Sequence, residues 1–170
     1  PGKTQKVDYE YVREGSCTIW MFVEPLGGWR DVVVTSTKKA IDWAHQIKAL
    51  VDSIRFANAE KIILVCDNLN THFFGSLYKA FGAEEAFRIM SRIELIHTPK
   101  HGSWLNMAEP ELSVLTRQCF TDRVGDQQEV ENRSTAWKAD RNKNQKGIDW
   151  QFTNDKARVK LKRLYPKIEL

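Results

Sequence analysis

A short apolar run that ends on a carboxylate is the feature that most constrains the fold of this chain. Residues 62–66 read Ile-Ile-Leu-Val-Cys and are followed by Asp67 and by the polar residues 68–72. Continuous apolar runs of this length, rich in β-branched residues, predict a strand covered on both faces of its sheet. In open α/β sheets the ligand crevice lies outside the carboxyl ends of such strands. Asp67 is therefore expected where a functional site would form.

The composition indicates one globular domain. The chain has 170 residues, is 42% hydrophobic and contains six Trp and eight Phe, which is enough material for a core. No segment approaches the roughly 20 apolar residues that a membrane span needs, and residues 1–6 lack the apolar core of a signal peptide. We therefore expect a cytoplasmic protein without a membrane partner.

The cysteines point to packing and not to a metal or disulfide framework. Cys17, Cys66 and Cys119 are odd in number, widely spaced and set in apolar or helical segments, and no Cys-x-x-Cys pair is present. This pattern favours buried free thiols over a zinc site.

Periodicity predicts a hairpin followed by alternating helices and strands. The hairpin covers 17–24 and 30–35, with a turn at 25–28. A helix over 38–55 follows, with Thr37 as its cap. Its buried stripe comprises Ile41, Ala44, Ile47, Val51 and Ile54.

The second half of the chain continues this alternation. After the strand that ends at Asp67, we expect a helical segment over 73–92 broken near Gly82, a strand over 93–97 and a helix over 107–120. A long polar helix then opens at Gly125, a linker at 142–147 ends it, and Thr153 caps a basic terminal helix. This order is that of a mixed α/β sheet with helices on both faces.

Two carboxylates occupy positions suited to metal chemistry. Asp67 ends a strand, and Glu109 lies in the first turn of the helix over 107–120. Mg²⁺ takes carboxylate oxygen and keeps water, and such sites in phosphoryl transfer usually use three carboxylates. Taken singly, Asp67 also fits an acid that caps the following turn, and Glu109 a first-turn acid favoured by the helix dipole.

The residues around these acids resemble a known family. Residues 67–72, Asp-Asn-Leu-Asn-Thr-His, and 98–109, Thr-Pro-Lys-His-Gly-Ser-Trp-Leu-Asn-Met-Ala-Glu, resemble the second and third catalytic blocks of mariner-like DDE-superfamily transposases, specifically the bacterial insertion sequence 630 family. The family's second block is Asp-Asn-x-x-x-His at a strand end. Its third is a Pro-rich loop, Leu-Asn, and a Glu two or three residues on. Residues 7–11, 22–26 and 150–153 also resemble one bacterial subgroup, so the similarity covers nearly the whole chain.

The resemblance implies a function, a cofactor and partners. It implies a transposase that cuts DNA as an endonuclease and performs strand transfer of an insertion sequence, with Mg²⁺ or Mn²⁺ as cofactor. The implied partners are double-stranded DNA, both element ends and target, and a second copy in a homodimer, in a nucleoid-associated bacterial protein. By position, Asp67 would be the second metal-binding acid and Glu109 the third. Forty-one residues, 68–108, separate them, somewhat more than is usual in the family, and the segment 82–85 is expected to be a surface connector that takes up the difference.

The resemblance also implies that part of the catalytic domain is missing. The implied fold is a ribonuclease-H-like mixed sheet flanked by helices. In the family, the first catalytic Asp lies on the first strand, before the segment that matches residues 7–11. We therefore expect residues 1–170 to be a partial DDE catalytic domain without its first strand, first Asp and helix-turn-helix region, with 126–170 as a C-terminal helical extension. Asp8 is an early acid, and the resemblance assigns it to the connector after that strand.

Several residues near the acids are candidates for supporting roles. Asn68 and His72 would orient Asp67, a metal-bound water or a phosphate, although His72 also fits a histidine that bonds locally at a helix start. In the loop before Glu109, Lys100, His101 and Ser103 are candidate phosphate contacts, with loop solvation as the alternative. Trp104 fits either a base-stacking platform or a hydrophobic staple. Glu111 faces a different side of its helix from Glu109 and is a poor substitute ligand.

A basic segment near the end of the chain is the second candidate DNA-binding element. The net charge of +4 is mild, but five cations gather between positions 156 and 163. They are Lys156, Arg158, Lys160, Lys162 and Arg163. The alternative is a solvated helix face whose Val159, Leu161 and Leu164 dock on the core.

Two other functions remain open at this stage. Without the first Asp, the chain would be a catalytically inactive remnant that binds DNA or associates with itself. The third reading is a ribonuclease-H-like nuclease that acts on RNA or on hybrid duplexes.

Overall fold

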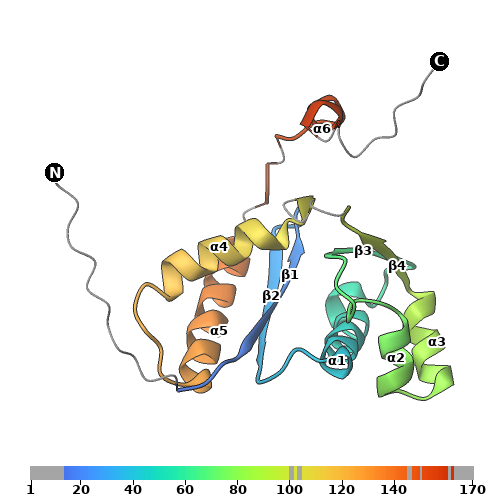
Figure 1. The fold of residues 1–170 in the computed structure, drawn as a ribbon, viewed down its shortest axis with the longest axis horizontal. Coiled ribbons are helices and arrows are strands. Elements are labelled where there is room, and N and C mark those ends of the chain that lie inside the picture. Colours follow the sequence, from blue (N-terminus) through green and yellow to red (C-terminus); the bar gives the residue numbers. More distant parts are fainter. Residues whose placement is uncertain are drawn as a thin grey trace.

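The fold alternates short strands with helices. The computed structural model describes residues 14–99, 102, 105–144, 147–149, 151–160 and 162. In chain order the elements are β1 (Thr18–Glu24), β2 (Trp29–Thr35), α1 (Ala40–Val51), the 3-10 helix η1 (Ile54–Phe56), β3 (Ile62–Cys66), α2 (Gly75–Ala80), α3 (Ala83–Ser91), β4 (Ile93–His97), α4 (Ala108–Cys119), α5 (Gln127–Asn144) and α6 (Asn154–Lys160) (Figure 1). The prediction of a mixed α/β architecture is confirmed, and each predicted strand is present within one residue of its expected bounds.

The strands form two separate pairs. β1 and β2 are an antiparallel hairpin, with Thr18 opposite Thr35 and Glu24 opposite Trp29. Gly28 takes a φ of 64° in the connecting turn, which glycine adopts without steric cost. β3 and β4 pair in parallel, with Ile62 opposite Ile93. The expectation of one mixed sheet is therefore wrong for the described residues, because β1 and β3 each have a hydrogen-bonded strand on one edge only.

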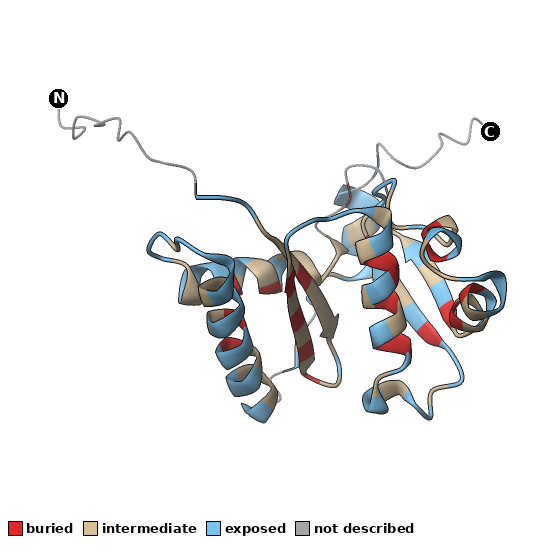
Figure 2. Cartoon of the chain, turned by 90° about the horizontal axis from the view of Figure 1, so that it is seen from below, coloured by how far each residue is buried: buried red, intermediate tan, exposed pale blue. Residues whose placement is uncertain are grey.

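The larger core joins both strand pairs to three helices. It includes buried residues of α1, which are red in Figure 2, together with residues of α2, α3 and the strands. They are Trp20, Trp43, Ala44, Ile47, Val51, Ile62, Leu77, Ala86, Ile89 and Ile93. Because α1 packs against residues from both strand pairs, the two pairs share one apolar layer although no ladder connects them.

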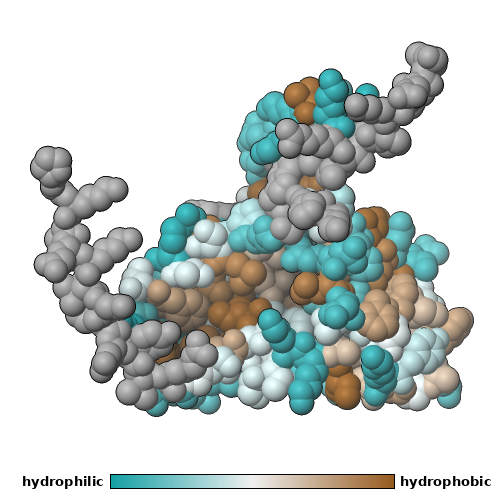
Figure 3. All heavy atoms as spheres, viewed as in Figure 1, coloured by the Kyte–Doolittle hydropathy of each residue, from teal (hydrophilic) through white to brown (hydrophobic). Residues whose placement is uncertain are grey.

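A smaller core lies on the other face of the hairpin. Val32, Leu115 and Trp137 are buried there, contributed by β2, α4 and α5. Side chains alternate between the faces of a strand, so Val32 enters this core while Val33 packs against the larger one. Hydrophobic surface is visible on the side shown in Figure 3, between the hairpin and helices α4 and α5. The hairpin is thus covered on both faces.

The β3–β4 pair is covered on one face only within the described residues. Ile62 and Ile93 are buried, but Ile63 is 64% exposed, Val65 46% and Ile96 43%. The expectation that the strand before Asp67 is covered on both faces is therefore wrong. Helices α1 to α3 pack on one face of the pair, which carries Ile62 and Leu64 of β3. A continuous apolar run in the sequence does not show whether one face of the strand or both faces are buried.

Other local predictions also need correction. The stripe of α1 is buried at Ala44, Ile47 and Val51, but Ile41 is 45% exposed and Ile54 is 93% exposed because the helix ends at Val51. The helix begins at Ala40 after Lys39, so Thr37 is not its cap; the Thr37 hydroxyl instead donates to the Asp42 carboxylate.

The boundaries of the later helices differ less from their predicted positions. The predicted break near Gly82 is confirmed, since Gly82 separates α2 from α3. However, Ala83, Glu84 and Glu85 form the first turn of α3 and are not a connector. Helix α5 continues to Asn144, into the segment predicted as a linker, because Asn142 binds the edge of β2. None of the described helices has both the length and the apolar character needed to cross a bilayer.

Candidate active site at the ends of β3 and α4

Asp67 follows directly on β3 and is half-buried. The turn after it closes on its main chain: the Leu69 amide donates to the Asp67 carbonyl at 2.8 Å, and the His72 amide donates to the Leu69 carbonyl at 2.9 Å. Neither of these two hydrogen bonds uses the carboxylate of Asp67. The carboxylate of Asp67 accepts instead from Asn106, with 2.9 Å between Oδ1 and Nδ2.

His72 is packed between aromatic side chains beside this turn. Its ring stacks on Trp43 with 5.9 Å between centroids and lies 6.3 Å from the ring of Trp20. Its Nδ1 lies 3.3 Å from the carbonyl oxygen of Asp67. Burial lowers the pKa of His72, which the hydrogen bond and charge of Asp67 offset only in part. The imidazole is therefore neutral at pH 7 and contacts the main chain of Asp67.

His97 ties β4 to the same turn. Its Nε2 lies 2.6 Å from the main-chain carbonyl of His72, a contact in which the ring nitrogen donates. The Thr98 amide also donates to the carbonyl of Cys66, the last residue of β3, at 2.9 Å. The ends of the two parallel strands and the turn after Asp67 thus form one hydrogen-bonded unit.

Glu109 lies in the first turn of α4 and is half-buried. Its amide donates to the main-chain carbonyl of Asn106 at 3.1 Å, and the amide of Ala108 donates to the Asn106 side-chain Oδ1 at 3.0 Å. The same Asn106 side chain binds Asp67. The structure therefore brings the strand end that carries Asp67 to the start of the helix that carries Glu109, with Asn106 between them.

Sequence reasoning missed Asn106 as a site residue. It stands three positions before Glu109 in the Leu-Asn pair of the third catalytic block, and asparagine favours helix starts. Those two signals identify a helix start. The hydrogen bond from Asn106 to Asp67, however, joins residues 39 positions apart, and no local sequence pattern indicates it.

Several predicted residues are exposed or lie outside the described residues. Asn68 is exposed. Lys100, His101, Ser103, Trp104, Arg163, Leu161 and Leu164 lie outside the described residues, as does Asp8. Nothing structural follows for those candidates.

The basic segment forms the short helix α6 with no buried residue. The Lys156 amide donates to Thr153 Oγ1 at 3.3 Å, so the predicted cap is confirmed. Val159 is 79% exposed, which contradicts the alternative that it docks on the core. Lys156, Arg158, Lys160 and Lys162 are all exposed. Part of this charge is engaged locally, since Lys160 Nζ lies 6.0 Å from the centre of the Phe152 ring.

Glu111 faces away from the candidate site, as predicted. It is 5% exposed and accepts two hydrogen bonds from Arg30, from Nε at 2.9 Å and Nη2 at 3.0 Å. Arg141 of α5 donates to it at 3.0 and 3.2 Å. Burial alone would raise the pKa of Glu111, but the hydrogen bonds and charges of the two arginines outweigh it and lower the pKa. This buried triad fixes α4 to β2 and α5.

The cysteines are free thiols, as predicted, but only Cys66 is buried, whereas Cys17 and Cys119 are half-buried. Cys66 is buried next to Asp67, and burial together with the Asp67 charge raises its pKa to about 11. Burial also raises the pKa of Cys119. Cys66 is therefore protonated at pH 7 and is not a nucleophile beside the carboxylate.

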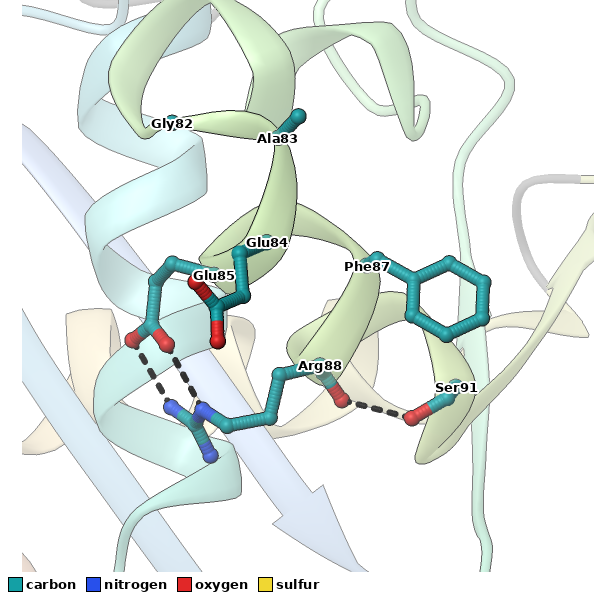
Figure 4. Close-up of a pocket in the computed structure, with 7 residues that line it drawn as sticks. All are labelled: Gly82, Ala83, Glu84, Glu85, Phe87, Arg88 and Ser91. Atoms are coloured by element: carbon teal, nitrogen blue, oxygen red, sulfur yellow. Dashed lines mark hydrogen bonds and ion pairs between the residues drawn. The ribbon is translucent and has the colours of Figure 1, made fainter.

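A surface pocket on α3 is separate from these residues. It is lined by side chains from Gly82 to Ser91, and Figure 4 shows Arg88 turned back onto Glu85 across it. Arg88 also binds Asp52 at 2.8 Å, and Lys48 of α1 pairs with both Asp52 and Glu85. These ion pairs link α1 to α3. No residue of the candidate site lines the pocket.

The two carboxylates are the type of ligand that a hard divalent ion prefers. Asp67 and Glu109 provide carboxylate oxygens from two elements, and Mg²⁺ is commonly bound through one or two carboxylates while it keeps several waters. Within the described residues, however, no group of three or more His, Cys, Asp or Glu side chains is placed to hold a metal. The third carboxylate that the resemblance implies is not among them.

Comparison with known proteins places the chain in a family. Residues 1–131 match the family model described as DDE superfamily endonuclease, and the matched range contains both Asp67 and Glu109. Neither a curated protein nor a solved structure gave a match. Because the match covers most of the chain and the two acids lie at the ends of β3 and α4, the chain belongs to the DDE superfamily endonucleases.

Proposed function

We propose that this chain provides two of the metal-binding carboxylates of a DNA transposase, and that the intact protein belongs to the mariner-like insertion sequence 630 family. The observation that carries the proposal is the hydrogen-bonded link from Asp67 through Asn106 to the first turn of α4. Within the matched family range, this link joins the two motifs that sequence separates by 41 residues, 68–108.

Each carboxylate has a defined part in this proposal. Asp67 and Glu109 would hold Mg²⁺ or Mn²⁺. In this class of reaction the ion stabilises the charge on the attacking and leaving oxygens of a phosphodiester. The neutral, packed His72 keeps the turn after Asp67 in place through its contact with the Asp67 carbonyl. The substrates are the ends of a DNA element and its target, and the active assembly is a dimer.

The proposal is tested by neutralising each acid in the intact protein. Asp67→Asn and Glu109→Gln are each expected to reduce Mn²⁺-dependent nicking of supercoiled DNA on the order of a thousandfold, since charge stabilisation by a bound ion supplies several kcal/mol of the barrier reduction. Glu131→Gln, an exposed residue of α5, is the matched control and should cleave as the unchanged protein does. Full cleavage by the Asp67 variant would refute the site.

A second function is favoured by the exposure of α6. With Val159 79% exposed and the surrounding cations exposed, the basic segment is available to phosphates without any metal. A protein that binds DNA in EDTA, with affinity that falls steeply with salt, yet does not cleave would be a non-catalytic binder. Replacing Lys156, Arg158, Lys160, Lys162 and Arg163 by Gln should then abolish binding. Preference for an RNA–DNA hybrid in competition would instead indicate the ribonuclease reading.

A further inference from the structure

The side chain of Asn106 makes two hydrogen bonds, one to Asp67 and one to the start of α4. Its Nδ2 donates to Asp67 Oδ1 at 2.9 Å, and its Oδ1 accepts from the amide of Ala108 at 3.0 Å. A primary amide carries a donor and an acceptor at its end, whereas an ionised carboxylate only accepts and an aliphatic side chain does neither. This position therefore uses both the donor and the acceptor of the asparagine amide.

The backbone on either side of Asn106 is also constrained. The Leu105 amide donates to the Gly102 carbonyl at 2.9 Å, and the Gly102 amide donates to the Pro99 carbonyl at 2.8 Å. A Cβ at Gly102 would lie 2.9 Å from Pro99 Cγ and 3.1 Å from its carbonyl oxygen, so the chain passes closer to Pro99 than other residues allow. Two main-chain hydrogen bonds thus connect Pro99, two residues after β4, with Leu105, which precedes Asn106.

Helix α4 is held independently at its other side. Glu111, two residues beyond Glu109, is buried between Arg30 of β2 and Arg141 of α5. Rotation or translation of α4 would break that triad. Asn106 consequently connects a carboxylate on β3 to a helix whose own position is already set.

We propose that Asn106 is a positioning residue for the two carboxylates. Its amide fixes the orientation of the Asp67 carboxylate and attaches it to the start of α4, so that Asp67 and Glu109 present their oxygens to one divalent ion. Asn106 is not a ligand in this account: its Nδ2 donates to Asp67 and its Oδ1 accepts from the Ala108 amide. The inference rests on the proposed function.

The experiment measures Mn²⁺ binding to the full chain by calorimetry, together with the thermal unfolding midpoint. Asn106→Ser keeps an oxygen that can accept from the Ala108 amide but is too short to reach Asp67, so it separates the two bonds. We expect its unfolding midpoint to stay close to that of the unchanged chain and its Mn²⁺ affinity to fall about 10-fold to 100-fold, the effect typical of residues that orient a ligand. Asn132→Ser, on the exposed face of α5, is the matched control and should bind Mn²⁺ normally.

A double variant makes the test specific. If Asn106 acts through Asp67, then adding Asn106→Ser to Asp67→Asn should cause no further loss of Mn²⁺ affinity. Normal Mn²⁺ binding by Asn106→Ser, in a chain where Asp67→Asn lowers the Mn²⁺ affinity, would overturn this inference and leave the proposed function standing. Mn²⁺ binding that Asp67→Asn leaves unaffected would overturn the proposed function and this inference with it.

Discussion

Different forces stabilise the two halves of the molecule. The apolar half comprises α1, α2, α3, β3 and β4, and its core contains Ala44, Ile47 and Leu77 with no exposed surface. The ion-pair half comprises β1, β2, α4 and α5, and contains the buried pair of Arg30 and Glu111, joined by the half-buried Arg141, beside a small apolar core. Nondirectional burial is enough to collapse the first half, whereas the second also requires charged groups to meet in one geometry.

The difference follows from the character of α5. This helix has 18 residues, of which only Ser134 and Trp137 are buried. Its attachment therefore depends on polar contacts: Lys138 with Asp31 at 2.7 Å, Arg141 with Glu111, and the Asn142 side chain with both main-chain groups of Arg30 at 2.8 Å. Those contacts specify where the helix lies along β2.

The candidate site lies where the two halves meet. Asp67 belongs to the apolar half, Glu109 to a helix of the ion-pair half, and Asn106 connects them. The comparison implies that changes in either half can separate the two acids, by loss of stability in one case and by loss of orientation in the other.

The largest expected effect on stability comes from breaking the triad. Glu111→Ala leaves the buried Arg30 and the half-buried Arg141 without their partner, and removal of one member of a buried ion pair typically costs about 3–5 kcal/mol. The free energy of unfolding from denaturant titration measures this loss. Glu129→Ala, which breaks the solvent-exposed pair with Arg133, is the matched control and should cost far less.

A companion variant distinguishes stability from orientation. Replacing the whole triad by apolar residues, Arg30→Met with Glu111→Leu and Arg141→Met, should restore most of the lost free energy, because apolar replacements avoid the desolvation cost of the charges. If the triple variant were as unstable as Glu111→Ala, directional pairing would be needed for stability itself, and the contrast between the halves would be sharper than we infer.

A somewhat smaller loss is expected in the apolar half. Ile47→Ala removes a fully buried side chain of α1 and should lower the free energy of unfolding by about 3 kcal/mol, from lost burial and the cavity that remains. Ile54→Ala, at a residue that is 93% exposed, should change it by about 0.5 kcal/mol or less. Equal losses from the two substitutions would show that the apolar half is not packed as described.

The smallest expected effect is a dependence of the free energy of unfolding on pH in the acidic range. The pKa of Glu111 is lower in the folded chain than its ordinary value of 4.5, so its contribution to stability is complete above pH 4.5 and is lost as pH falls through the lower folded value. The difference in unfolding free energy between the unchanged chain and Glu111→Gln should therefore shrink below pH 4.5.

Glu85 is a second carboxylate whose pKa is lowered in the folded chain, and it serves as the reference. Hydrogen bonds from Arg88 and Lys48 lower the pKa of Glu85 to about 2, and this group lies in the exposed network between α1 and α3. High salt should weaken the acid dependence that Glu85 causes and leave that of the buried Glu111 largely intact. A Glu111 effect that salt removes would argue against burial of the triad.

Much of the local structure could be predicted because it depends on neighbours in the sequence. The strands before Asp67 and Thr98, the helix break at Gly82 and the Thr153 cap follow from apolar runs, glycine and a capping hydroxyl. The errors arose where a partner decided the outcome. Ile54 is exposed because α1 ends before it, and α5 runs past its predicted end because Asn142 binds β2.

The same distinction applies to the candidate site. Asp67 and Glu109 could be selected as candidate site residues because each lies in a local sequence motif, one at a strand end and one at a helix start. Arg30, Arg141 and Asn106 were not identified as partners, since each looks locally like an ordinary strand, helix or turn residue. Their importance depends on contacts with residues 30 to 81 positions away.

The sequence by itself determined the α/β class, the order of the elements, the two acidic motifs and the family they indicate. Only the tertiary structure decided that the described strands form two pairs, that one face of β3 and β4 is exposed, and that Asn106 joins Asp67 to the helix of Glu109. The physical reason is range. Periodicity and capping act over a few residues along the chain, whereas strand pairing, buried ion pairs and the approach of two carboxylates depend on which distant surfaces pack together.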